Sequence, residues 1–206
     1  MGLEAQLKTI NAGIKEVSIQ QRKDSLVLVA TLPAKVGGRK PHQQRIPTGH
    51  KYAWMTQALV IYGCRPSEIF SLRPQEDGTA EVLTVKRKGK LPTWRTALAL
   101  PIAGLPALTG RSVVWDVKSP AEYDSLEASR LVKNWGKWLN NKWSKQVMAD
   151  VDLYDFRHAW ALRSIRKNLN ASLAAKTMGH SLDVHHRTYH RWLEAADVAA
   201  VAASLK

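Results

Sequence analysis

The sequence has a single cysteine and no long apolar run, and each shortage excludes a class of protein. Among its 206 residues only Cys64 is a cysteine, which excludes an internal disulfide and a thiolate-rich zinc cage. No apolar run is long enough to span a bilayer, and the amino terminus MGLEAQLKTI lacks the apolar segment and cleavage site of a signal peptide. We therefore expect a cytoplasmic protein in which Cys64 is a small core residue.

Acidic residues are scarce relative to basic ones. Lys and Arg together number 31 against 17 Asp and Glu, so the formal net charge is +14. Such an excess of positive charge attracts polyanions, and nucleic acid is the first partner to consider. An anionic lipid surface is the alternative, but the sequence has no continuous basic amphipathic helix of the membrane-surface type. We expect double-stranded DNA as a partner and no membrane contact.

Residues 1–48 form a first unit, predicted to be small and rich in β structure. A helix is predicted in LEAQLKTINAGI. The alternation in VSIQQRKDSLVLVATLP predicts a hairpin with RKDS as its turn, and HQQRIPTG predicts a third short strand. Because three strands and one helix enclose little core, we expect this unit to pack on something larger or on DNA.

Residues 49–206 form the second unit, in which helical spacing dominates. The expected fold class is therefore α+β, mainly α. Helices are predicted in YAWMTQALVIYG, which ends at Gly63, in RPSEIFSL, and in LEASRLVKNWGKWLNNKWSKQV. Two more are predicted in DFRHAWALRSIRKNL, opened by Asp155, and in ASLAAKTMGHS, closed at Gly179.

The same unit contains one clear β segment. EVLTVKRKGKLPTWRTALALP predicts a hairpin or three-stranded meander that turns near Lys88. Residues 103–125 read as loop around a short strand. A final helix, AADVAAVAASLK, has an apolar stripe that could cover the protein's own core or dock on a second copy of the chain.

Three separated segments place polar side chains beside helix termini: GCRPSEI, YDFRHAW and MGHSLDVHHRTYHRW. Together they supply two arginines, a histidine and a tyrosine, a set that suits a phosphodiester. Two guanidinium groups can hold the nonbridging oxygens of a phosphate in forked hydrogen bonds, and fixed cations help most where charge builds in a transition state. Arg65 precedes a predicted helix whose dipole also favours an anion.

The last of these segments surrounds one tyrosine with four histidines. Two of them are spaced by one helical turn, as in a helical metal pair. No cysteine and few carboxylates lie nearby, which disfavours a metal. We therefore expect these histidines to bind no metal. The histidines are His180, His185, His186 and His190.

In order and spacing, these segments resemble the boxes of the tyrosine recombinase or phage integrase family. YGCRPSEIFSL resembles the first arginine box, VKRKGK the β-hairpin lysine, YDFRHAW the His-x-x-Arg box, and MGHS with RTYHRW the final His and Tyr boxes. The resemblance covers roughly residues 50–200. More loosely, residues 1–48 resemble three-stranded arm-site DNA-binding modules. The resemblance implies a catalytic domain of helices with a small antiparallel sheet, preceded by a small β-rich module.

The resemblance also implies a site-specific DNA recombinase that cuts and rejoins DNA through a 3′-phosphotyrosine, with neither ATP nor metal as a cofactor. Tyr189 would attack the scissile phosphate, and two arginines would clamp it. His180 would hydrogen-bond the phosphate or orient the nucleophile. Lys88 would protonate the leaving oxygen, with Lys86 as the competing candidate. The implied catalytic residues are Arg65, Lys88, Tyr154, Arg157, His180 and Tyr189.

DNA contacts are expected from further basic residues and one histidine. A tetramer on DNA, assembled through the last helix, is the expected oligomer. The residues expected to contact DNA are Arg22, Lys23, Arg45, Lys86, Arg87, Lys90, Arg95 and His158.

The pattern departs from the family in two places. Tyr154 stands where the box has histidine, and a phenol with a pKa near 10 is a poorer proton shuttle than an imidazole near 6.5. A helical core-binding domain, roughly 80 to 100 residues long in this family, is not evident before the first arginine box. The alternative function is therefore that of a truncated integrase, catalytically weak or inactive, that acts as a DNA-binding protein. A metal-dependent nuclease using the histidines is a third hypothesis.

Overall fold

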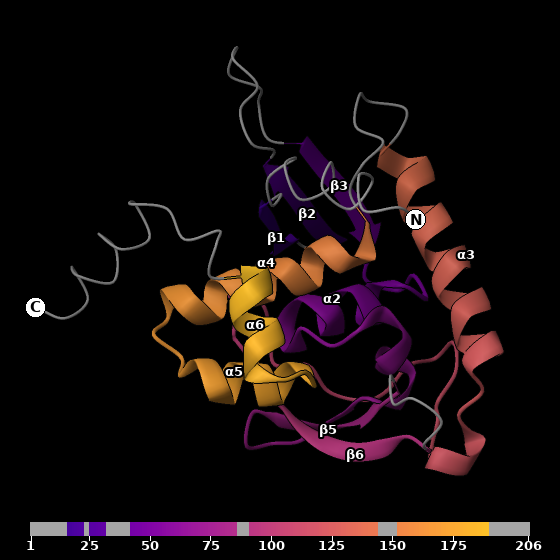
Figure 1. The fold of residues 1–206 in the computed structure, drawn as a ribbon. Coiled ribbons are helices and arrows are strands. Elements are labelled where there is room, and N and C mark those ends of the chain that lie inside the picture. The colour runs from indigo at the N-terminus through magenta and orange to yellow at the C-terminus, as the bar shows by residue number, and fades with distance from the viewer. Residues whose placement is uncertain (1–15, 23–24, 32–41, 86–90, 144–151, 190–206) are drawn as a thin grey trace, which may run out of the picture.

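The computed structural model describes residues 16–22, 25–31, 42–85, 91–143 and 152–189. Two small antiparallel sheets lie at opposite ends, with the helices α2 (Ala53–Tyr62) and α4 (Leu153–Arg166) between them (Figure 1). Helix α3 (Ser125–Trp143) runs along one side, and α5 (Ala171–Met178) and α6 (Leu182–Tyr189) lie on the other. The predicted α+β, mainly α fold class is confirmed.

The first sheet contains the predicted hairpin and third strand. Its order is β1 (Glu16–Arg22), β2 (Ser25–Thr31) and β3 (His42–Pro47), all antiparallel. Leu26 of β2 lies opposite Ile46 of β3, and both side chains are buried in the same core as the helices. Strand β1 contacts α4 and α2. The sheet therefore rests on the helical part of the chain. The predicted helix in residues 3–14 lies outside the described residues.

Helix α2 is mostly apolar, is buried on nearly all sides, and ends where the sequence predicts. Gly63 adopts the left-handed conformation, with φ 61°, and its N–H bonds to Leu59 O at 3.0 Å. A Cβ at this position would lie 2.5 Å from Cγ of Trp160 on α4. Both the turn and the close packing therefore require glycine.

The element after α2 differs from its prediction. Residues Pro66–Ser71 form a 3₁₀ helix, η1, instead of an α-helix. In a 3₁₀ helix each N–H bonds to the carbonyl three residues earlier, as Leu72 N does to Ile69 O at the end of η1. The Ser71 hydroxyl also donates to Glu68 O at 2.8 Å. So short a segment does not complete enough turns to propagate an α-helix.

The second sheet contains the hairpin predicted in residues 81–101, whereas its third strand lies before that segment in the chain. Its order is β4 (Arg73–Pro74), β5 (Thr79–Thr84) and β6 (Thr93–Leu98). The predicted turn at Lys88 lies outside the described residues. The strand predicted within residues 103–125 is wrong: that segment is irregular apart from the 3₁₀ turn η2 (Pro120–Glu122) and the first residue of α3. Within this segment, two prolines and two glycines with positive φ interrupt any regular strand.

Helix α4 begins one turn earlier than the sequence indicated. Its N-cap is Asp152, whose carboxylate accepts from Tyr154 N at 2.6 Å and Asp155 N at 3.1 Å. Asp155 was predicted to open the helix. Its carboxylate instead accepts a hydrogen bond from Asp152 N–H at 2.8 Å. This reciprocal pair is a capping box. It places Tyr154 inside the first helical turn.

The buried side chains form two apolar clusters. The larger joins α2, η1, β5, α3 and α4. The smaller contains Trp160, Met178 and Tyr189. Trp135 and Trp160 are fully buried. None of the helices in the described ranges is long and apolar enough to cross a membrane.

Candidate active site

The first arginine box is tied to the end of a distant helix. Arg65 precedes η1, and its Nη1 lies 2.7 Å from Glu68 Oε1 while its main-chain N–H bonds to Glu68 Oε2 at 2.9 Å. Its Nη2 donates to Gly179 O at 2.9 Å. Arg65 therefore holds the residue that precedes His180, although 114 positions separate Arg65 from Gly179 in the chain.

Glu68 is a buried carboxylate shared by two arginines. Its Oε2 lies 2.7 Å from Nη2 of Arg95, so the side chain bridges Arg65 and Arg95. Burial acts to raise the pKa of Glu68, but Arg95, Arg65 and Arg157 together hold it below its ordinary value. Sequence reasoning missed this residue. The available signal was its position three residues after Arg65, at the start of a helix, which is the spacing of a capping box.

Arg95 was expected to contact DNA, and the structure places it inside the protein. Its side chain is 11% exposed, pairs with Glu68 and also donates to Thr177 O. The guanidinium packs against Gly179, where a Cβ would lie 2.5 Å from Arg95 Nε. The charge of Arg95 is therefore used to join β6 to η1 and to the end of α5.

Arg157 joins the ends of two helices. It is almost fully buried on α4 and donates to Gly63 O at 2.7 Å and to Met178 O at 2.8 Å. Carbonyls at helix C-termini lack partners within the helix, so they are natural acceptors for these bonds. Burial lowers the pKa of Arg157, opposed chiefly by Glu68. An arginine keeps its charge in proteins, so a cation is held at this junction.

Tyr189 ends α6 with its side chain buried, at 3% exposure. Its hydroxyl lies 3.3 Å from His158 Nδ1. Burial raises the pKa of Tyr189, and the charges of Arg157 and Arg65 oppose that rise without cancelling it. The side chain is therefore a neutral phenol at neutral pH, beside two arginines that come from other elements.

His180 and His185 form a stacked imidazole pair beside Tyr189. Their ring centroids are 5.3 Å apart, and His185 is fully buried. His180 Nδ1 lies 3.1 Å from Ser181 O. Because a carbonyl only accepts, Nδ1 carries the proton and Nε2 carries the lone pair. Burial lowers the pKa of His180 to about 4, so this imidazole is neutral at pH 7.

The structure brings most of the expected catalytic residues into one region. Tyr154 lies at its edge, 46% exposed, with its ring centroid 6.4 Å from that of His158. Lys88 lies outside the described residues. The gathered residues are Arg65, Tyr154, Arg157, His180 and Tyr189.

The expected DNA contacts are more scattered. Arg22 ends β1 opposite Ser25, and Arg45 lies in β3 opposite Val27. His158 faces Tyr189. The remaining basic residues of that prediction, apart from Arg95, lie outside the described residues: Lys23, Lys86, Arg87 and Lys90.

The histidines do not form a metal site within the part of the chain that the structure describes. There, no group of three or more His, Cys, Asp or Glu side chains is arranged to hold an ion. His186 is exposed on α6, and His190 lies outside the described ranges.

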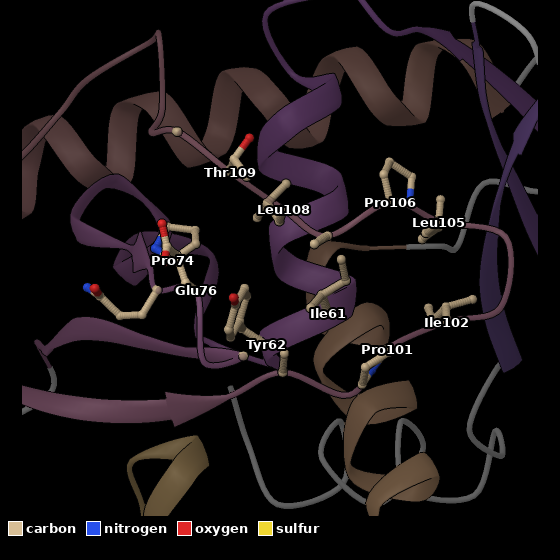
Figure 2. A pocket seen from close by; sticks show the side chains of 15 residues that line it. Ile61, Tyr62, Pro74, Glu76, Pro101, Ile102, Leu105, Pro106, Leu108 and Thr109 are labelled. Carbon is tan, nitrogen blue, oxygen red and sulfur yellow. The ribbon is translucent and has the colours of Figure 1, made fainter.

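A cavity of about 610 Å³ lies at the C-terminal end of α2 (Figure 2). Ile61 and Tyr62 line it from the helix, and Ile102, Leu105 and Leu108 line it from the loop opposite. Its described lining is mostly apolar and includes no basic side chain and none of the residues gathered around Tyr189. A phosphate therefore suits the arginine cluster rather than this cavity.

Two proteins named excisases are similar in sequence. Excisase A of Nostoc sp. strain PCC 7120 is 44% identical over 152 residues, which is 68% of this chain. Excisase C of the same organism is 27% identical over 154 residues, or 71% of this chain. The matches cover 31% and 30% of those proteins, so the chain spans about a third of the length of either relative. No protein-family model matches the chain.

Solved structures are also similar to this chain at low sequence identity. One is the crystal structure of XerA recombinase, with 15% identity and a TM-score of 0.49. The match covers 76% of this chain and 57% of the XerA chain. Another is the Tn1549 transposon integrase in complex with a circular intermediate DNA, with 13% identity and a TM-score of 0.44. That match covers 76% of this chain and 60% of the integrase chain.

Proposed function

We propose that this tyrosine recombinase-like chain cuts and rejoins DNA, with Tyr189 as the nucleophile. The observation that carries the proposal is the convergence of a buried phenol with two arginines from distant elements. Arg65 precedes η1 and Arg157 lies on α4, yet both charges act on Tyr189. A phosphodiester is the ligand class that matches two cations and a hydroxyl nucleophile.

In the proposed first step, the Tyr189 oxygen bonds to phosphorus and the 5′ oxygen of the DNA leaves. The product is a 3′-phosphotyrosine, which keeps the energy of the phosphoester bond for rejoining to another 5′ hydroxyl. Arg65 and Arg157 stabilise the charge that builds on the nonbridging oxygens. Each guanidinium has five N–H groups, so both arginines retain donors for phosphate beyond their protein contacts. Lys88 is assigned to protonate the leaving oxygen.

The protonation of His180 favours one of the two roles open from the sequence. With its proton on Nδ1, neutral His180 has a lone pair at Nε2 and cannot donate from there to a phosphate oxygen. Its ring lies 6.1 Å from that of Tyr189 and nearly parallel to it, with an interplanar angle of 30°. We assign His180 to orienting the nucleophile.

A nicked suicide substrate tests the proposal, because loss of the short product strand traps the covalent intermediate. The wild-type chain is expected to form a protein–DNA adduct in EDTA, and Tyr189→Phe is expected to form none. Tyr52→Phe is the matched control, since Tyr52 packs against Trp135 and Trp138, away from the cluster. Binding without an adduct would support a DNA-binding protein instead. Cleavage that EDTA abolishes would support a metal-dependent nuclease.

A further inference from the structure

The Tyr189 hydroxyl has an imidazole neighbour, His158, that was predicted to have another role. His158 Nδ1 lies 3.3 Å from the hydroxyl oxygen, and the ring centroids are 5.7 Å apart at an angle of 57°. His158 follows Arg157 directly on α4, so this helix presents a cation and an imidazole to the same phenol. The expectation from sequence was a DNA contact.

A phenol in this position requires a proton acceptor. Burial keeps Tyr189 protonated at neutral pH, and a tyrosine attacks phosphorus efficiently only as its proton leaves. A base must lie within hydrogen-bonding range of the hydroxyl, or reach it through one water. The identity of that base therefore depends first on geometry.

Other candidates near Tyr189 are less suitable. Glu68 is bound at 2.7 Å by both Arg65 and Arg95, so its oxygens are already used. Tyr154 carries a phenol, which is a poorer proton acceptor than an imidazole. His180 stacks on Tyr189 rather than directing an edge nitrogen at its oxygen, since the interplanar angle is 30°. Among the described residues, His158 is the group whose ring nitrogen is found within hydrogen-bonding distance of the Tyr189 hydroxyl.

We propose that His158 is the general base that accepts the Tyr189 proton, an inference that rests on the proposed function. As the Tyr189 oxygen bonds to phosphorus and the bond to the 5′ oxygen breaks, the phenolic proton passes to His158 Nδ1. The leaving oxygen takes a proton from a separate acid, assigned above to Lys88. In the reverse step His158 returns its proton to Tyr189, so the cycle balances.

A base at His158 also bears on the presence of Tyr154 where the family's box has histidine. Tyr154 and His158 are four residues apart on α4, so they share a face of the helix, and their ring centroids are 6.4 Å apart. The imidazole that the resemblance leads one to expect at position 154 is thus present one helical turn further along, directed at the nucleophile.

The test compares single-turnover adduct formation on the nicked substrate for wild type and His158→Gln. Loss of a general base is expected to slow the step by about 10² to 10⁴-fold. A fluorinated tyrosine at position 189 has a more acidic phenol, so it should restore much of the rate to His158→Gln while changing the otherwise wild-type rate little. His186→Gln, on the exposed surface of the same helix as Tyr189, is the matched control and should react like wild type.

Two outcomes would overturn the proposal while leaving the proposed function standing. One is a His158→Gln rate within about twofold of wild type. The other is an equal slowing with tyrosine and with fluorotyrosine, because a purely structural role is insensitive to the acidity of the phenol. If wild type itself forms no adduct, the proposed function fails, and the assignment of His158 fails with it.

Discussion

Glu68→Gln should destabilise the protein severely while changing its shape very little. The wild-type carboxylate is fully buried and neutralises two arginines whose side chains are 13% and 11% exposed. A neutral amide would leave both cations without their counter-charge at the junction of η1, β6 and α5. Breaking a buried ion pair by removing one partner costs about 3 to 5 kcal/mol. Because both arginines retain some solvent contact, we expect a loss of about 3 kcal/mol.

The assay is equilibrium urea unfolding at pH 7. For an m value of about 2 kcal/mol/M, a loss of about 3 kcal/mol lowers the midpoint by about 1.5 M with m unchanged. Glu127→Gln is the matched control, because Glu127 forms an exposed pair with Arg130 and its removal should give no measurable shift. An equally small shift for Glu68→Gln would refute the assignment of Glu68 as a stabilising buried carboxylate.

The pH dependence provides a second check on the same residue. The folded-state pKa of Glu68 lies below its ordinary value of 4.5. Its contribution to stability is therefore fully present above that ordinary value and is lost as the pH falls through the lowered folded-state pKa. The midpoint difference between wild type and Glu68→Gln should accordingly shrink in acid. A difference that is constant down to the acid unfolding transition would contradict the pairing.

Three other substitutions test separate parts of the structure. Gly63→Ala should lower the urea midpoint by an amount equivalent to at least about 1 kcal/mol, because the position has φ 61° and its Cβ would meet Trp160; an unchanged midpoint would contradict the close packing. Arg157→Lys should slow adduct formation by about 10²-fold or more, since one ammonium cannot replace the forked donors; a near-wild-type rate would rule out the phosphate clamp. Arg22→Ala should weaken DNA binding and reduce the salt slope by about 1; an unchanged slope would argue against a DNA role for β1.

Much of the fold was predictable from local chemistry. Gly63 and Gly179 mark helix ends correctly because both must adopt a left-handed conformation that other residues resist. Alternation located the hairpins of both sheets. The start of α4 was misplaced because Asp152 and Asp155 both suit a cap, and only the reciprocal hydrogen bonds distinguish the cap from its partner.

The site was less predictable where burial decides a residue's role. A basic residue on a strand suggests a contact with DNA. Arg95, however, is two residues from buried Ala97, so both side chains lie on the same, inward face of β6. Its partner Glu68 comes from another element, and no local pattern announces such a pair. The contact of His158 with Tyr189 likewise joins α4 to α6 across 31 positions, which spacing along the chain does not reveal.

The most direct test of the central claim is to identify the residue that carries DNA after trapping with the nicked substrate. Digestion of the adduct with trypsin and nuclease should yield the peptide Thr188–Arg191, in which Tyr189 is the only tyrosine, with the added mass of a nucleotide phosphate. Fragment ions should place that mass on the phenol. A nucleotide found on any other residue, or cleaved DNA with no modified peptide, would contradict the assignment of Tyr189 as the nucleophile.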